Sequence, residues 1–256
     1  MQSSERVKFL TETPELHGSD ETQEYIRQEV ARPSKAWVQE VVACGRESEF
    51  VKLRTADFVL LPDINCHRRP GRPYRTRLAT RQETEPALLA RAAANGARRF
   101  NWLVILADAG LRSIRDLRGQ HIPMLERMHR LCVEAIQREY RVAAEDVMVF
   151  ANYPPSVYKL HFHFCVPFFK PTAYDAFRMH TLSSILNNLR IHPDYYRLST
   201  FQIPVHRNSD LYRAIGSPDT SSGDSEEEQG AAALELLTSY SNRDPGGPPL
   251  ALLTMR

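Results

Sequence analysis

Residues 157–168, with the sequence VYKLHFHFCVPF, alternate between apolar and polar side chains. This period of two predicts a β-strand with one apolar face and one polar face. The polar face carries three basic side chains, those of Lys159, His161 and His163. The run DVMVFANYPPS directly before it predicts a second strand that ends in a proline-rich turn. We therefore expect the two strands to form an antiparallel hairpin.

The remaining apolar pattern predicts two helices and several further strands. Short runs that favour strands are EFVKL, DFVLLPD, NWLVILAD and STFQIPV. Apolar residues recur at helical spacing from Ile122 to about Tyr140, with Gly119 as the expected N-cap, and again over residues 174–189. Residues 36–43, AWVQEVVA, fit a helix or a strand equally. Strands that pack on one long helix predict an α+β domain with a mostly antiparallel sheet.

Composition separates a folded part from the rest of the chain. From residue 216 onward Ser, Gly, Pro and Glu dominate without apolar periodicity, which predicts a disordered C-terminal tail over residues 216–256. The net charge is only +2, so no polyelectrolyte partner is required, but residues 66–99 contain nine arginines and two acidic residues. We interpret this stretch as a solvated insertion, and contact with phosphates is the alternative.

Cysteine usage and hydropathy indicate a compartment. The four cysteines show no paired spacing, which is typical of free thiols in a reducing compartment. The N-terminal residues MQSSERVKFL lack the apolar run of a signal peptide, and no apolar stretch is long enough to span a bilayer. We therefore expect a cytoplasmic or nuclear protein, or one present in both, with no membrane contact.

The polar face of the histidine strand allows three interpretations. The side chains could be exposed or hydrogen-bonded in a polar core. They could bind a metal, for which only Cys165 is a further ligand nearby. A neutral imidazole could instead attack phosphorus, flanked by groups that hold the phosphate charge. Ser156 lies five residues before His161, where a hairpin can bring its hydroxyl to the same pocket.

The stretch PPSVYKLHFHF resembles the motif of the histidine triad (HIT) superfamily, in which three histidines alternate with apolar residues on a strand. The middle histidine of that motif is the nucleophile, which corresponds to His161 here. Lys159 occupies the first position and His163 the third. The resemblance implies a HIT-like fold with a catalytic set drawn from the strand and the preceding turn: His161, His163, Lys159 and Ser156.

A closer resemblance, to the scavenger mRNA decapping enzyme family, extends over about residues 7–215. It rests on ETPEL, WVQEVVACGRE, FVLLPD, GLRSIRDLRGQHIPMLERM, AIQREYRV and PPSVYKLHFHF, which agree in order and spacing. It implies a hinge-like segment over residues 1–35 and a cap-hydrolase domain over residues 36–215, with 66–99 as an insertion. The substrate-binding residues predicted with it are Trp37, Glu47, Pro62, Asp63, Asn65, Asn152 and Arg178.

The chemistry of the 7-methylguanosine cap suits these residue types. Methylation at N7 makes guanine cationic, and tryptophan is the best aromatic partner for a cation. In the family the tryptophan, here Trp37, stacks on the base, while a carboxylate such as Glu47 or Asp63 can accept from its N1–H and N2 amine.

The chain departs from the family pattern at three points. Lys159 replaces the first histidine of the motif, and it can hold phosphate charge but cannot shuttle a proton as imidazole does. Asn65 replaces a phosphate-binding lysine. The chain begins at the family's hinge, so we expect it to lack the swapped N-terminal domain that closes over the cap.

The resemblance implies metal-independent hydrolysis of cap dinucleotide or short capped RNA fragments, with no cofactor, by a homodimer. His161 would attack the phosphate next to 7-methylguanosine, giving 7-methyl-GMP and a nucleoside diphosphate or RNA 5′-diphosphate. Two alternatives remain open. One is a cap-binding or regulatory protein with little hydrolysis, which Lys159 and Asn65 favour. The other is a HIT-type hydrolase of a different dinucleotide.

Overall fold

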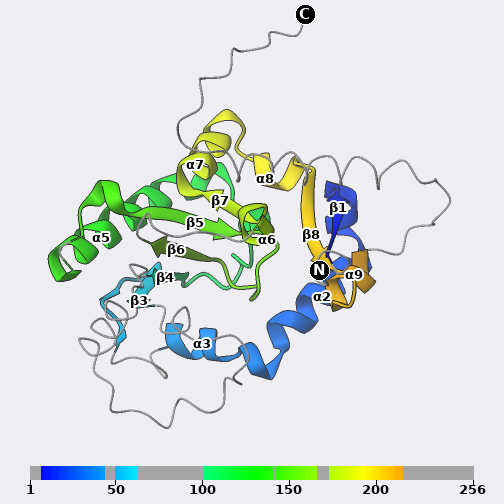
Figure 1. The fold of residues 1–256 in the computed structure, drawn as a ribbon, viewed down its shortest axis with the longest axis horizontal. Coiled ribbons are helices and arrows are strands. Elements are labelled where there is room, and N and C mark those ends of the chain that lie inside the picture. Colours follow the sequence, from blue (N-terminus) through cyan, green and yellow to red (C-terminus); the bar gives the residue numbers. More distant parts are fainter. Residues whose placement is uncertain (1–6, 44–49, 63–100, 141, 166–172, 216–256) are drawn as a thin grey trace, which may run out of the picture. The chain divides into compact units, whose positions relative to one another are not determined.

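The computed structural model describes residues 7–43, 50–62, 101–140, 142–165 and 173–215 (Figure 1), and the structural statements below concern these residues. The strands are β1 (Val7–Glu12), β2 (Leu53–Arg54), β3 (Phe58–Pro62), β4 (Asn101–Leu106), β5 (Met148–Asn152), β6 (His161–Cys165), β7 (Met179–Thr181) and β8 (Phe201–His206). The helices are α1 (Pro14–Gly18), α2 (Asp20–Ala31), α3 (Trp37–Val42), α5 (Ile122–Tyr140), α6 (Ala173–Ala176), α7 (Leu182–Ile191), α8 (Tyr195–Leu198) and α9 (Asp210–Ile215). Four 3₁₀ turns lie at 33–35, 114–116, 119–121 and 144–146.

Six of the strands form one sheet, in the order β2-β3-β4-β6-β5-β7, and every neighbouring pair is antiparallel. Strands β5 and β6 pair as the predicted hairpin, with Phe150 opposite His163. Strands β1 and β8 form a separate antiparallel pair. The α+β class with a mostly antiparallel sheet and a long helix is therefore confirmed.

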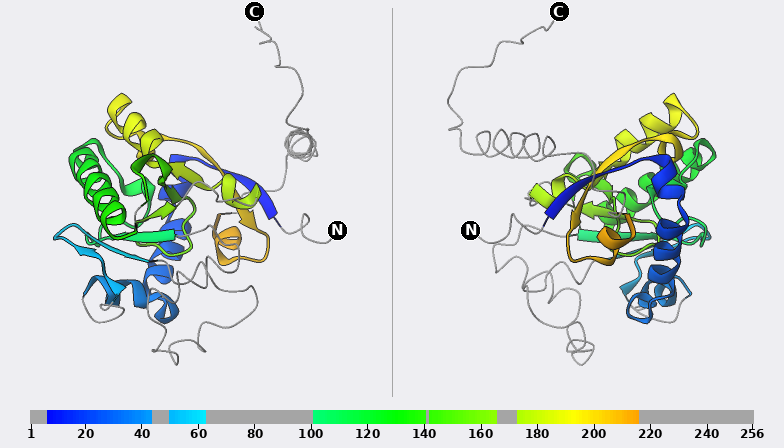
Figure 2. Two further views of the ribbon diagram at one scale, coloured as in Figure 1. Left: turned by 60° about the vertical axis from the view of Figure 1, so that its left-hand side comes forward. Right: turned by 90° about the vertical axis from the view of Figure 1, so that its right-hand side faces the viewer.

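The large sheet is covered on both faces by helices (Figure 2). Alternate residues of β3, β4 and β6 pack against α5 in the main core, whose members include Phe58, Leu60, Trp102, Val104, Phe162, Phe164, Leu125, Met128, Cys132 and Ile136. The intervening residues of β3 and β4 form a smaller cluster with α3, made of Val38, Val41, Val59, Leu61, Leu103 and Ile105. Each such side chain contributes about 1.5–3 kcal/mol when fully buried.

The segment at residues 36–43, which fitted a helix or a strand, is the helix α3. Its buried side chains, Val38 and Val41, are three residues apart, as one face of a helix requires. This helix therefore lies over the sheet face opposite to α5.

The single helix predicted over residues 174–189 is wrong, because three elements occupy this stretch. Thr181 ends β7 with an extended backbone, and its side chain caps α7 by accepting from the Ser184 amide at 3.2 Å. An N-cap residue is not itself helical. The apolar repeat continues across the cap, so it does not reveal the break.

Three predicted boundaries also need correction. The EFVKL strand is reduced to Leu53–Arg54, and the predicted strand over residues 157–168 begins only at His161. Gly119 is not the N-cap of α5 but opens the 3₁₀ turn before it. A Cβ at Gly119 would lie 3.0 Å from the Pro193 Cβ, so this glycine permits a close approach.

The structure also bears on the predictions made for the cysteines, for membrane-spanning segments, and for the insertion and the tail. Cys132 and Cys165 are buried free thiols, and burial raises the pKa of Cys165 to about 11. In the described part of the chain, no helix combines the length and apolarity needed to cross a membrane. The insertion at 66–99 and the tail at 216–256 lie outside the described residues.

Candidate active site

The two histidines project from β6, which lies between β4 and β5 inside the sheet. His161 is opposite Ile105, and His163 is opposite Leu103. Directly opposed residues share a sheet face, and both of these partners belong to the cluster packed against α3. The imidazoles therefore lie on the α3 face, 5.4 Å apart between ring centroids and nearly perpendicular.

A hydrogen bond determines the tautomer of His161. Its Nδ1 lies 2.7 Å from the main-chain oxygen of Lys159. Because a carbonyl oxygen only accepts, Nδ1 carries the proton in this contact. In the neutral ring the lone pair is then on Nε2, which is the form required of a nucleophilic imidazole.

His163 is held as a neutral ring between two amides. Its Nδ1 lies 3.2 Å from Asn101 Nδ2, its Nε2 lies 3.4 Å from Asn152 Nδ2, and its ring stacks on Phe150 at 5.0 Å. Burial, followed by the charges of His161 and Arg178, lowers the pKa of His163 to about 3. His163 is therefore uncharged at neutral pH.

The amide of Asn152 completes this contact in only one orientation. A neutral imidazole has one N–H and one acceptor, so two amide nitrogens cannot both donate to it. Among the described residues the buried Asn152 Oδ1 has no hydrogen-bond partner. Turning the amide by 180° places this oxygen where it accepts from Nε2–H of His163, while Asn101 donates to Nδ1.

Lys159 lies before the first residue of β6, so the predicted ladder of three basic residues on one strand is wrong. Its side chain is buried with 1% of its surface exposed, and its Nζ donates to the main-chain oxygens of Ala107 at 2.8 Å and Asp108 at 2.9 Å. Burial lowers the pKa of Lys159, partly offset by Asp108. Directly before His161 the chain is instead held through the Leu160 peptide groups, which bond to Leu111 and Leu106.

The proline-rich turn between β5 and β6 is fixed by Arg178. The guanidinium donates twice to the Pro154 oxygen, at 2.7 and 3.1 Å, and stacks over Tyr174 at 5.1 Å. The Arg178 oxygen accepts from the Tyr153 amide at 2.7 Å. Ser156 is exposed in the same turn. Of the predicted residues, Ser156 therefore lies within the connection that leads into the histidine strand, and Arg178 holds the start of this connection.

Trp37 is the first residue of α3 and is half-buried against the apolar cluster on the α3 face. It thus lies on the same side of the sheet as the two histidines. Pro62 is buried at the end of β3, opposite Trp102, and so belongs to the α5 face. Of the other predicted cap contacts, Glu47, Asp63 and Asn65 lie outside the described residues.

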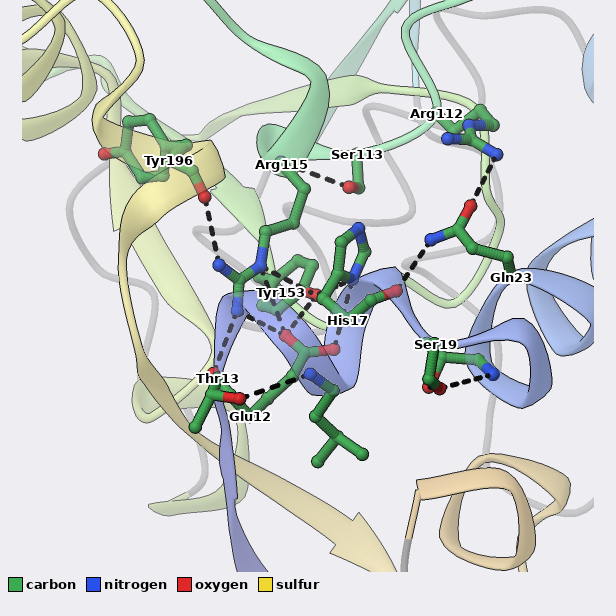
Figure 3. Close-up of polar contacts among 12 residues, drawn as sticks. Glu12, Thr13, His17, Ser19, Gln23, Arg112, Ser113, Arg115, Tyr153 and Tyr196 are labelled. Atoms are coloured by element: carbon green, nitrogen blue, oxygen red, sulfur yellow. Dashed lines mark hydrogen bonds and ion pairs between the residues drawn. The ribbon is translucent and has the colours of Figure 1, made fainter.

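Sequence reasoning missed a buried polar network behind the proline-rich turn (Figure 3). Arg115 Nη2 pairs with Glu12 Oε2 at 2.7 Å, and Arg115 Nη1 donates to the Tyr196 oxygen at 3.0 Å. The Tyr153 hydroxyl donates to Glu12 Oε2 at 2.5 Å, and His17 Nδ1 lies 3.3 Å from Glu12 Oε1. Burial alone would raise the pKa of Glu12, but His17, Arg115 and Tyr153 together lower it.

This network joins three distant segments. It connects the end of β1, the 3₁₀ turn at residues 114–116, and Tyr153, which directly follows Asn152. Asn152 contacts His163, so the network supports the residues that hold the site. No sequence pattern predicts that Glu12 or Arg115 is buried. The only available sign was that Glu12 lies in ETPEL and Arg115 in GLRSIRDL, two stretches that carry the family resemblance.

Asn101 was also missed, because its role depends on strand pairing. It is the first residue of β4, and its side chain contacts His163 on the neighbouring strand β6. Its position beside a histidine could be inferred only once the pairing register was known.

Within the described ranges, no group of three or more His, Cys, Asp or Glu side chains is arranged to hold a metal ion.

The fold and the histidine pair define an α+β protein of the histidine triad type. A family model described as "Scavenger mRNA decapping enzyme C-term binding" matches residues 36–176, more than half of the chain. The chain therefore belongs to this family, and the predicted resemblance is confirmed. The match includes Trp37, Lys159, His161 and His163, while Arg178 lies two residues beyond it.

Curated relatives are all named m7GpppX diphosphatase. The protein of Bos taurus is 35% identical over 109 residues, covering 43% of this chain and 32% of the relative. The Homo sapiens protein is 31% identical over 113 residues, covering 44% and 34%. The Schizosaccharomyces pombe protein is 26% identical over 165 residues, covering 63% and 45%. The chain thus matches 32–45% of the length of these three relatives.

Proposed function

We propose that this protein hydrolyses the 7-methylguanosine cap of cap dinucleotide or short capped RNA fragments through a histidine nucleophile. The observation that carries the proposal is the hydrogen bond from His161 Nδ1 to the Lys159 oxygen, which leaves the lone pair on Nε2. The names of the relatives support the choice of substrate.

The reaction takes place in two displacements. His161 Nε2 attacks the phosphorus next to 7-methylguanosine, forming an N–P bond while the bond from that phosphorus to the bridging oxygen breaks. The nucleoside diphosphate, or RNA 5′-diphosphate, leaves with the electron pair. Water then attacks the same phosphorus, the N–P bond breaks, and 7-methyl-GMP is released.

Groups around His161 stabilise the phosphoryl charge. His163 is neutral at pH 7 and its one N–H is directed at Asn152, so it lies beside His161 as an uncharged ring and not as a cation. Arg178 supplies positive charge close enough to lower the His163 pKa. Ser156 in the adjoining turn supplies a hydroxyl. Preorganised donors of this kind lower the barrier because they are already oriented when charge develops.

The methylated base binds at Trp37. The indole stacks on the cationic ring, and its position on the α3 face supports a base site on the same side of the sheet as His161. Glu47, Pro62 and Asp63 complete the base contacts in this proposal, with Asn65 and Asn152 nearer the phosphates. The protein acts as a homodimer in the cytoplasm or nucleus, as the family resemblance implies.

The alternative is a cap-binding protein with little hydrolysis, and one observation favours it. The Lys159 ammonium is engaged by two carbonyl oxygens, so this position does not offer a ready cation to the phosphates. Such a protein needs Trp37 for binding but gains nothing from His161.

One experiment separates the two functions. Purified protein is incubated with EDTA and either methylated or unmethylated cap dinucleotide, beside the variants His161→Asn and Trp37→Ala. The proposal expects 7-methyl-GMP from wild type and methylated cap, none from His161→Asn, and much less from Trp37→Ala. Tight binding of methylated cap without release would instead establish the binding protein, and equal hydrolysis of both caps would establish a different dinucleotide hydrolase.

A further inference from the structure

We propose that Lys159 is a positioning residue for His161 and does not contact the phosphate. The inference rests on the proposed function and assigns Lys159 a different part in it. Its ammonium anchors the main-chain oxygen that fixes the His161 tautomer.

The first step of the argument is where the ammonium lies. Nζ makes charge-assisted hydrogen bonds to the oxygens of Ala107 and Asp108, in the turn directly after β4. The lysine itself is buried, with 1% of the residue exposed, while Ala107 is half-buried and Asp108 is exposed. These bonds use two of the three N–H donors, but the residue is only 1% exposed, so Nζ could reach a phosphate only if the side chain left this position. Loss of both carbonyl bonds would then offset what the phosphate contributes.

The second step is what else holds the same stretch of chain. The Leu160 amide donates to the Leu111 oxygen at 2.9 Å, and the Leu160 oxygen accepts from the Leu106 amide at 3.1 Å. The Lys159 amide donates to the Val157 oxygen at 2.9 Å. The Leu160 amide belongs to the same peptide group as the Lys159 oxygen, and the other two bonds hold the peptide groups on either side of it. The lysine side chain adds a further connection from this stretch to the turn after β4.

The third step connects this anchor to the chemistry. The Lys159 oxygen accepts from His161 Nδ1 at 2.7 Å. If that oxygen moves, Nδ1–H loses its acceptor, the ring samples the other tautomer, and the lone pair is less often on Nε2. The residue therefore acts on the turnover step through His161, while ground-state binding of phosphate is unaffected.

Two variants distinguish positioning from phosphate binding. Lys159→Met removes both charge and hydrogen-bond donors at similar length, whereas Lys159→Gln removes the charge and keeps an N–H donor. Positioning predicts that kcat of Lys159→Met falls about 10- to 100-fold with KM within about twofold, and that Lys159→Gln recovers part of the loss. Binding of 7-methyl-GMP stays within about twofold of wild type for both. A phosphate contact predicts instead that both variants weaken 7-methyl-GMP binding alike, about tenfold or more.

A measurement without substrate keeps the inference separate from the proposed function. Nitrogen-15 NMR of the imidazoles, assigned with His161→Asn and His163→Asn, reports each tautomer. The inference predicts an Nδ1-protonated His161 in wild type, a tautomer mixture in Lys159→Met, and unchanged signals for His163, which two asparagines hold. An unchanged His161 in folded Lys159→Met, or in Lys159→Gln if the methionine variant does not fold, would overturn it. If wild type shows this lysine-dependent tautomer but releases no 7-methyl-GMP, the positioning inference holds and the proposed function fails.

Discussion

Replacing Arg115 with methionine should destabilise the protein more than any loss of a surface ion pair. The side chains of Arg115 and Glu12 are 1% and 3% exposed, and 2.7 Å separates their charged atoms. Arg115→Met leaves the Glu12 carboxylate buried without its cation, which costs about 3–5 kcal/mol. Typical domains have about 5–15 kcal/mol in total, so the variant should approach the limit of folding.

The assay is urea unfolding monitored by circular dichroism. The change in the free energy of unfolding is taken from the shift of the midpoint, provided that the dependence on urea concentration has the same slope in each variant. The matched control is Arg130→Met, because Arg130 and Glu134 form a pair at 3.4 Å with side chains 61% and 54% exposed. The control should lose less than about 1 kcal/mol.

A double variant tests whether the cost comes from the unpaired charge. Glu12→Gln removes the carboxylate, so Glu12→Gln with Arg115→Met should lose clearly less than the sum of the two single variants. The reasoning is refuted if Arg115→Met costs no more than Arg130→Met, or if the two single costs simply add.

Three further predictions concern packing and pH. Gly119→Ala should lower the free energy of unfolding by about 1–3 kcal/mol, because the added Cβ would lie 3.0 Å from Pro193. The control is Gly18→Ala, whose Cβ meets nothing within 4 Å and should not destabilise the protein. Thermal unfolding of both variants checks this. Because the pKa of His163 is lowered, the unfolded state binds a proton at a higher pH than the folded state does. The contribution of His163 to the free energy of unfolding should therefore fall as the pH drops from about 6.5 toward about 3. His163→Asn should flatten the dependence of stability on pH in this range, and an unflattened profile would refute the burial argument. Glu12 has a lowered pKa, so its contribution is complete above its ordinary value near 4.5 and is lost as pH falls through the folded value; Glu12→Gln should lose that acid dependence, and equal acid sensitivity of both proteins would count against it.

The apolar repeat along the chain predicted those strands and helices in which the repeat is contained within a single element. The period of two over the histidine strand correctly placed His161 and His163 on one face, and the pairing of β5 with β6 followed from their short connection. The helical repeat likewise located α5. The same signal failed at Lys159, because the alternation continues upstream of the residue where strand pairing begins.

Features that depend on distant partners were not predictable from the sequence. Asn101 becomes a neighbour of His163 only through the register of β4 against β6. Glu12 and Arg115 are 103 positions apart, and each would be taken for a solvated charge on its own. The N-cap role of Thr181 was hidden because the apolar repeat runs through it without interruption.

The central claim is that His161 attacks the phosphorus next to 7-methylguanosine, and isotope labelling tests it most directly. Turnover of methylated cap dinucleotide in ¹⁸O-water should place the label in 7-methyl-GMP and none in the diphosphate product, and His161→Asn should give no product at all. Label in the diphosphate, or hydrolysis that persists without His161, would contradict the account.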